Sequence, residues 1–260
     1  MVKPKKRFGQ HFLKDEHIAR KIVESLTGHG KYDNVLEIGP GTGILTKYLL
    51  KTSWKIYCIE IDQESVDYLI HRYSSLKDNL IVGDFTRMNT MEFGDQIGLI
   101  GNFPYNISSQ ILFKALDHKD QFTEIVGMFQ KEVGKRIASP PGSKEYGILS
   151  VLLQAFYKVE YLFDVPPLVF YPPPKVHSAV LRLQRNNTVK LKCDEKLFKI
   201  IVKQGFQTRR KKLRNALKPL NLPQDIRSYE ILDLRAEQLS VEDFVKLTAK
   251  LQDGGWRNPI

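Results

Sequence analysis

Four consecutive residues, Asn102, Phe103, Pro104 and Tyr105, carry groups suited to holding an amine on a flat ring. The side-chain oxygen of Asn102 and the backbone carbonyl of Phe103 can accept hydrogen bonds from N–H groups, and Tyr105 can stack on the ring. Pro104 stiffens the turn between them. An exocyclic ring amine is a poor nucleophile because its lone pair is delocalised. Two acceptors that favour its tetrahedral form would activate it, so we predict that these four residues are catalytic.

Three glycines with the spacing G-x-G-x-G, Gly39, Gly41 and Gly43, follow an apolar run and precede a helix-like stretch. Glycine lets a backbone approach a ligand closely because it has no Cβ and tolerates positive φ. The spacing departs from the dinucleotide fingerprint G-x-G-x-x-G. It resembles the first motif of class I methyltransferases, which implies S-adenosylmethionine as the cofactor. A tight strand-to-helix turn without a ligand is the alternative interpretation.

Two acids support a cofactor site because each closes a later apolar run, where ligands bind in open α/β sheets. Glu60 is expected to accept hydrogen bonds from both hydroxyls of a ribose. By similarity to methyltransferases, Asp84 would accept one from the cofactor adenine, with Phe85 beside it to cover the ring. The cofactor set predicted from these residues is Gly39, Gly41, Glu60 and Asp84. Displacement at a sulfonium needs no strong base, so catalysis would be mainly positioning.

The elements that must position these residues follow from an alternation of apolar runs with helical stretches. The runs suit buried parallel strands and lie at residues 34–38, 55–60, 79–82, 97–100 and 124–129. Their alternation predicts a doubly wound α/β sheet of the class I, Rossmann-like methyltransferase type. Two more β-rich runs, 157–165 and 178–183, flank the proline-rich segment 166–174 and are expected to pair as an antiparallel edge.

The pattern changes after Arg185. Leu197, Phe198, Ile201, Val202 and Phe206 follow a helical period, and residues 240–243 (SVED) resemble an N-terminal cap before another helix. We therefore predict a methyltransferase catalytic domain over residues 1–185 and a small all-α, RNA-binding domain over residues 186–260.

Composition narrows the class of protein. No apolar run in the 260 residues approaches the roughly 20 needed to span a bilayer, and the basic N-terminus lacks the apolar core of a signal peptide, so we expect a cytoplasmic protein. Two cysteines suggest neither a disulfide framework nor a thiolate metal site.

Residues 186–260 hold 16 Lys and Arg against 9 Asp and Glu, which is +7 of the net charge of +11. This clustering favours a polyanionic partner.

The chain resembles the ribosomal RNA small-subunit adenine dimethyltransferases over nearly its whole length. The matching motifs are residues 7–13 (RFGQHFL), 37–43 (EIGPGTG), 102–108 (NFPYNIS), 130–133 (QKEV), 143–147 (SKEYG), 149–151 (LSV), 170–176 (FYPPPKV), 178–180 (SAV) and 207–215 (QTRRKKLRN). The resemblance implies N6,N6-dimethylation of two neighbouring adenosines near the 3′ end of small-subunit rRNA. It also implies the immature small ribosomal subunit as the partner, with the enzyme acting as a monomer.

The resemblance also assigns further site residues. His11 and Leu13 would lie over the methionine end of the cofactor, and Asn102 would join the residues that bind it. Phe170 would stack on the target adenine opposite Tyr105. The family usually has Asn where His11 stands, Leu where Phe103 stands and Asp where His177 stands. Phe103 still supplies its carbonyl and His11 can still donate a hydrogen bond, so we expect activity; His177 is expected at the surface.

A basic run follows in the C-terminal part of the chain. Its cations, Arg209, Arg210, Lys211, Lys212 and Arg214, are expected to face outward toward RNA phosphates while leucines pack inward. Three alternatives stay open: a large-subunit rRNA methyltransferase of the macrolide-resistance type, a DNA adenine methyltransferase, and a protein that acts mainly as a ribosome-assembly factor. A solvated helix face is the structural alternative for the basic run itself.

Overall fold

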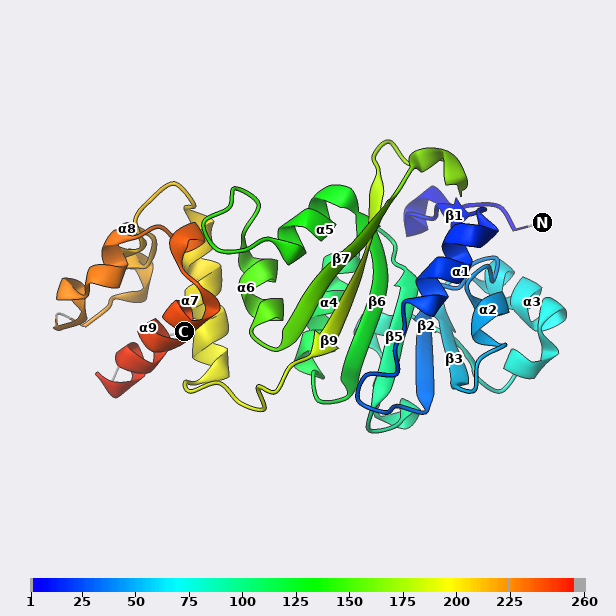
Figure 1. The fold of residues 1–260 in the computed structure, drawn as a ribbon, viewed down its shortest axis with the longest axis horizontal. Helices are drawn as coiled ribbons and strands as arrows, with labels where there is room; N and C mark the ends of the chain where they lie inside the picture. The colour runs from blue at the N-terminus through cyan, green and yellow to red at the C-terminus, as the bar shows by residue number, and fades with distance from the viewer. Residues whose placement is uncertain (1, 224, 255–260) are drawn as a thin grey trace. The chain divides into compact units, whose positions relative to one another are not determined.

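The chain divides into two units in the computed structural model, which describes residues 2–223 and 225–254 (Figure 1). The first unit is Met1–Gly134 with Lys158–Arg185, and the second is Lys135–Tyr157 with Asn186–Ile260. A boundary falls at residue 185, where the sequence pattern changes. Residues 135–157 differ from the expectation and group with the second unit, because their helix α6 (Ile148–Gln154) packs against two C-terminal helices.

A seven-stranded sheet forms the centre of the first unit, in the order β4-β3-β2-β5-β6-β9-β7. The strands are β2 (Asn34–Ile38), β3 (Lys55–Glu60), β4 (Leu80–Val82), β5 (Ile97–Asn102), β6 (Phe122–Gln130), β7 (Tyr157–Val165) and β9 (Ser178–Arg185). The first five are parallel, and β9 runs antiparallel to β6. This arrangement confirms the predicted α/β class, and β7 lies beside β9 at the edge, as the two β-rich runs indicated.

Helices pack on the sheet because the central strands are apolar on both faces. In β6, every residue from Phe122 to Phe129 is buried, as expected for a strand covered on both sides. The helices of the first unit are α1 (Glu16–Glu24), α2 (Thr46–Leu49), α3 (Gln63–Arg72) and α4 (Ser108–Asp117), and α5 (Lys131–Ala138) begins in the first unit and ends in the second. Figure 1 shows α1 in front of the sheet and α4 behind it. The parallel strands are thereby shielded from water and their carboxyl ends left open.

A second, two-stranded sheet joins the N-terminal segment to the proline-rich segment. It pairs β1 (Phe12–Leu13) with β8 (Phe170–Tyr171), antiparallel, with Phe12 opposite Tyr171 and Leu13 opposite Phe170. Sequence patterning did not predict this pairing, because two-residue strands carry no periodic signal.

The second unit is helical, as its sequence pattern predicted. Besides α6 it contains α7 (Glu195–Gln207), α8 (Leu213–Ala216) and α9 (Val241–Asp253), with 3-10 turns at Lys218–Leu220, Asp225–Ser228, Glu230–Asp233 and Ala236–Gln238. Phe198, Ile201 and Phe244 are fully buried between the long helices. The predicted cap is confirmed: Ser240 Oγ accepts from the Asp243 N–H at 3.1 Å, and Asp243 Oδ2 accepts from the Ser240 N–H at 3.0 Å.

Candidate active site

Five of the predicted residues converge at the carboxyl ends of the parallel strands. Gly39 and Gly41 follow β2, Glu60 ends β3, Asp84 lies just beyond β4 and Asn102 ends β5. All five line one cavity of about 690 Å³, open solvent included. Parallel neighbours end at the same edge of a sheet, so residues far apart in the chain meet there.

Gly41 occupies a position where a side chain would be strained. Its φ is +58°, and a Cβ there would lie 2.8 Å from Cε1 of the Phe12 ring. The left-handed conformation disfavours a side chain, and the ring would have to move to admit one. The Gly41 N–H donates to Glu60 Oε2 at 3.0 Å, which fixes the glycine loop against the acid on the next strand. The floor of the cavity is therefore bare backbone.

The Glu60 carboxylate is buried, yet it keeps acceptor capacity. Its Oε1 accepts from the backbone N–H groups of Ile61 at 2.9 Å and Asp62 at 3.0 Å, in addition to the Gly41 bond to Oε2. Burial raises the pKa of Glu60, and these hydrogen bonds act in the opposite direction. An ionised carboxylate offers about four acceptor sites, so one remains for a hydroxyl group of a ligand.

Asp84 is held rigidly at the rim of the same cavity. Its Oδ1 accepts from the Thr86 N–H at 2.9 Å and from the Thr86 hydroxyl at 2.7 Å, and its Oδ2 lies 3.6 Å from Arg87 Nε. Phe85, the next residue, is buried and lines the cavity. An acceptor and an aromatic ring thus stand side by side, which suits a flat heterocycle with an amine.

The Asn102 side chain is oriented by one hydrogen bond. Its Nδ2 donates to the backbone carbonyl of His11 at 2.8 Å. The amide nitrogen is thereby engaged, and the oxygen is left as an acceptor in the cavity. The Phe103 side chain is fully buried against Phe129, whereas no described residue donates to the Phe103 carbonyl. Both predicted acceptors are thus available to an amine.

Tyr105 separates the first cavity from a second, more open cleft. The Tyr105 ring stacks on the His11 ring, with centroids 5.5 Å apart, and its hydroxyl lies 2.5 Å from Ser178 Oγ. Tyr105 and His11 line both cavities. Pro104 lies in the wall of the first cavity, next to the glycine loop. An aromatic pair therefore stands where the two cavities meet.

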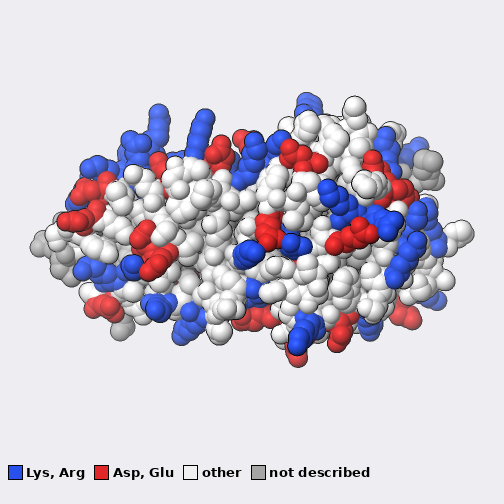
Figure 2. All heavy atoms as spheres, in the orientation of Figure 1, with Lys and Arg blue, Asp and Glu red and all other residues white. Residues whose placement is uncertain are grey.

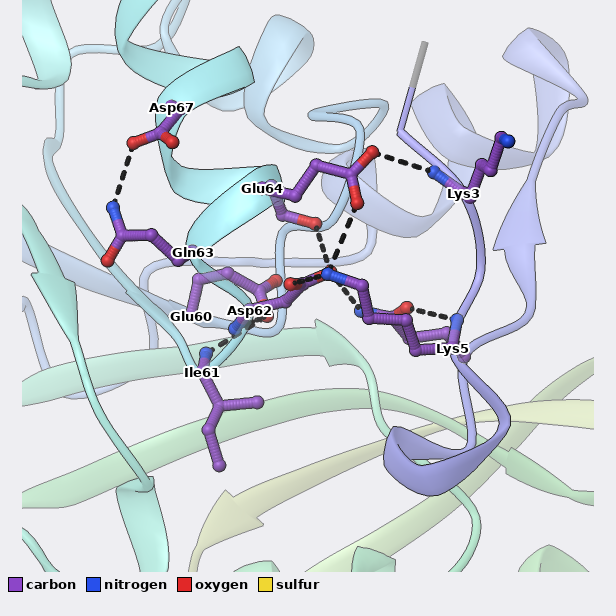
Figure 3. A network of polar contacts seen from close by, with 10 residues as sticks. Lys3, Lys5, Glu60, Ile61, Asp62, Gln63, Glu64 and Asp67 are labelled. Atoms are coloured by element: carbon purple, nitrogen blue, oxygen red, sulfur yellow. Dashed lines mark hydrogen bonds and ion pairs between the residues drawn. The ribbon is translucent and has the colours of Figure 1, made fainter.

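The N-terminal segment, which carries His11, closes one side of the first cavity, and the contact that holds it there was not predicted from the sequence. Residues 8–12 line it, and Lys5 fastens the segment to the start of α3 (Figure 3). Lys5 Nζ contacts the Asp62 carboxylate and lies 3.2 Å from Glu64 Oε2. Asp62 is almost fully buried: burial alone would raise its pKa, but hydrogen bonds from Lys5 and Gln10 outweigh it and lower the pKa. A charge pair between residues 57 positions apart is invisible to a motif search.

Two residues that the family resemblance assigned to the site lie outside both cavities. Leu13 and Phe170 are buried, 3% and 1% exposed, and face each other across β1 and β8 in the core of the first unit. In this conformation the structure does not bring the Phe170 ring to the cleft. Tyr171, beside it, is 57% exposed. His177 is exposed, as expected.

The basic run of the second unit separates into two kinds of cation. Arg209 donates to the carbonyl oxygens of Ser143, Lys144 and Tyr146 and so fixes a loop. Lys212 and Arg214 both pair with Asp233, at 3.4 and 2.8 Å. Arg210 and Lys211 are exposed and form no ion pair within the described residues. On the face in Figure 2, Lys and Arg project from the second unit among acidic side chains.

Other classes of site find little support in the described part of the chain. Within residues 2–223 and 225–254, no group of three or more His, Cys, Asp or Glu side chains is placed to hold a metal ion. Cys58 and Cys193 are buried and unpaired with each other. None of the helices described is both long and apolar enough to cross a membrane.

Known proteins match this chain over nearly its whole length. The sequence profile of the family "Ribosomal RNA adenine dimethylase" matches residues 1–253. "Ribosomal RNA small subunit methyltransferase A" of Cytophaga hutchinsonii is 56% identical over 252 residues, 96% of this chain and 98% of that protein. The protein of the same name from Flavobacterium johnsoniae is 56% identical over 256 residues, 98% of each.

Solved structures agree with the fold. A dimethyladenosine transferase from Plasmodium falciparum has a TM-score of 0.81 at 27% identity, covering 95% of this chain and all of the other. The 23S rRNA methyltransferase ErmE has a TM-score of 0.64 at 22% identity, covering 91% and 99%, and shows the shared fold alone. The chain belongs to the ribosomal RNA adenine dimethylase family.

Proposed function

We propose that the chain transfers methyl groups from S-adenosylmethionine to N6 of two adjacent adenosines near the 3′ end of small-subunit rRNA. The observation that carries the proposal is the Asn102 amide, which lines the cavity and whose nitrogen is held by the His11 carbonyl, so that its oxygen is left as an acceptor. Relatives named as small-subunit methyltransferases, 56% identical over almost the whole chain, support the choice of RNA.

The residues of the first cavity fit the cofactor. Bare backbone at Gly39 and Gly41 would accept the close approach of its amino-acid end, and Glu60 would accept a hydrogen bond from one ribose hydroxyl at its remaining acceptor site. Asp84 would accept from the adenine amine, with Phe85 against the ring. When bound, S-adenosylmethionine supplies a methyl group on a sulfonium, a strong electrophile.

The target amine would be activated by geometry alone. With Tyr105 against the base, the Asn102 oxygen and the Phe103 carbonyl accept its two N–H groups and direct the nitrogen lone pair toward the methyl donor. Holding both groups in line converts a bimolecular reaction into an effectively unimolecular one. The ammonium that results is acidic, so its proton can pass to water in the open cleft without a dedicated base.

Methylation of isolated ribosomal subunits tests the proposal. Small and large subunits from a strain that lacks the modification are incubated with the protein and a methyl-labelled donor. We expect label on adenosine near the 3′ end of small-subunit rRNA, read as N6,N6-dimethyladenosine after nuclease digestion. Label confined to the large subunit would show that small-subunit rRNA is not the substrate. Label on DNA added to the same reaction would show that the substrate polymer is not RNA.

The fastening of the N-terminal segment gives a second test. We expect Lys5→Met to weaken S-adenosylmethionine binding several-fold, measured by titration calorimetry. The reason is that Asp62 would lose its cation and the segment that covers the cavity would lose its anchor. High salt should narrow the difference only in part, because Asp62 is buried.

Lys3→Met is the matched control, since Lys3 reaches Glu64 through its backbone N–H, at 3.3 Å. Its affinity should equal that of the wild type. Equal affinities for Lys3→Met and Lys5→Met would show that the ion pair does not hold the segment over the cofactor.

The second unit is proposed to bind RNA phosphates through Arg210 and Lys211, the exposed members of its basic run that form no ion pair within the described residues. Replacing both with alanine should weaken RNA binding and lower the slope of log affinity against log salt, by roughly 0.7 to 0.9 for each phosphate that no longer meets a cation. Arg209→Ala should instead lower stability, because three loop carbonyls lose their donor. Filter binding at several salt concentrations and thermal unfolding distinguish these effects. An unchanged slope in the Arg210 and Lys211 variant would contradict the assignment.

A further inference from the structure

A second cleft extends from the aromatic pair away from the cofactor cavity. It is open to solvent, with about 1020 Å³ of space between its walls when open solvent is included. The cleft shares Gly9, Gln10, His11 and Tyr105 with the first cavity and continues along residues 172–176. A molecule whose amine reaches Asn102 would therefore have further atoms lying in this cleft.

The two walls of the cleft come from segments far apart in the chain. One wall is the N-terminal segment, with the 3-10 helix Lys6–Phe8, and the other is the proline-rich segment. The pairing of β1 with β8 ties the walls together, and His11 Nδ1 lies 2.7 Å from the Pro172 carbonyl oxygen. Three consecutive prolines restrict the second wall, because each has a fixed φ. The cleft is thus a built feature of the first unit.

The charge of the cleft is of one sign. Lys6 lines one wall and Lys175 the other; both are exposed, and neither forms an ion pair within the described part of the chain. Of the described residues that line the cleft, none is acidic. Their neighbours behave differently, since Lys5 pairs with Asp62 and Lys131 pairs with Asp164. Two cations left without partners across a cleft are suited to an anionic chain.

The target base also dictates the form of that chain. Its amine must reach Asn102 in the first cavity, so the base is unpaired, and a single strand presents such a base without the cost of flipping it out of a duplex. Backbone phosphates of a single strand lie a few ångströms from each base. Gln130, at the end of β6, adds amide donors in the same cleft. Phosphate contacts carry no base identity, so a one-nucleotide shift would present either of two adjacent adenosines.

We propose that Lys6 and Lys175 bind the phosphates that flank the target adenosine, so that the cleft is a subsite for single-stranded RNA backbone. The subsite rests on the proposed function, since the strand is positioned by the base in the active site. It holds the strand between the N-terminal and proline-rich segments. Sequence specificity must then come from contacts elsewhere on the RNA.

The test uses the full chain with Lys6→Met, Lys175→Met and the double variant. Binding of a single-stranded RNA oligonucleotide with two adjacent adenosines is measured over a range of salt concentrations. Each substitution should lower the slope of log affinity against log salt by about 0.7, the value for a single-strand phosphate contact. With small-subunit particles, KM should rise several-fold while kcat stays within twofold. Lys3→Met and Lys77→Met, exposed lysines outside the cleft, are the matched controls.

A chemical substitution on the RNA locates the contact. Neutral methylphosphonate linkages on either side of the target adenosine should weaken wild-type binding and have little further effect on the double variant. Three results would each overturn the subsite. The first is that the losses from the methylphosphonate linkages and from the lysine substitutions add, and the second is that the salt slopes of the variants are unchanged. The third is that binding of a fully duplex RNA depends on the two lysines as strongly as binding of the single strand. Failure of the proposed function would be seen in a different measurement, the position of the methyl label that the wild-type protein adds to RNA. An unchanged cofactor affinity in the lysine variants shows that they are folded.

Discussion

Replacing Asn102 with alanine is expected to lower methyl transfer by roughly 100- to 1,000-fold, the range for losing one preorganised hydrogen bond at a reacting group. The amide oxygen is one of two acceptors that make the adenine nitrogen nucleophilic, and its orientation is fixed by the bond from Nδ2 to the His11 carbonyl. Single-turnover rates at saturating cofactor measure the effect. Binding to small-subunit particles should be retained, because the amide reads one base amine and no phosphate.

The same substitution also removes the tie to the N-terminal segment, so a control is needed. Lys5→Met loosens that segment and keeps the acceptor. If Asn102→Ala and Lys5→Met both lose turnover only because they bind the cofactor more weakly, Asn102 is not an acceptor for the target amine. Phe103→Leu is a second control: its backbone carbonyl is unchanged, so turnover should be near that of the wild type despite a smaller side chain against Phe129. Full activity in Asn102→Ala would contradict the mechanism.

Local patterns predicted the parts of the site that depend on parallel strands. A buried parallel strand must be apolar along its length, and its carboxyl end must meet its neighbour's at one sheet edge. The positions of Gly41, Glu60, Asp84 and Asn102 around one cavity follow from that rule. The capping box at Ser240 was predictable for a similar reason, because its residues are only three positions apart.

Contacts over long sequence separations were not predictable from patterns. The ion pair of Lys5 with Asp62 and the pairing of β1 with β8 join segments that carry no periodic signal. The basic run is another case in which the sequence pattern did not predict the contacts. Sequence presents Arg209 and Arg210 as equivalent, whereas carbonyl oxygens from residues 143–146 occupy the first and leave the second exposed. Motif resemblance also does not report burial, as Phe170 illustrates.

The Glu37 carboxyl, buried in β2, has a pKa raised to about 7 from an ordinary 4.5. Burial is the cause, and a hydrogen bond of 2.7 Å from the Thr46 hydroxyl offsets it in part. The folded protein therefore keeps a proton that the unfolded chain releases. The free energy of unfolding should fall as pH rises from about 4.5 to about 7, by about 3 kcal/mol from this group, and then stay level.

Glu37→Gln removes this titration and retains an oxygen for Thr46. Relative to the wild type, we expect its stability to rise between pH 5 and pH 8, measured by urea unfolding at both values. Glu124→Gln is the matched control of opposite sign. Burial would raise the pKa of Glu124, but hydrogen bonds from Tyr32 and Thr27 outweigh it and hold the pKa below its ordinary value. That carboxylate stabilises the fold above its unfolded pKa, so Glu124→Gln should cost more stability at pH 8 than at acidic pH. A Glu37→Gln protein whose stability changes with pH as the wild type's does would mean that Glu37 is already ionised in the folded state at pH 5.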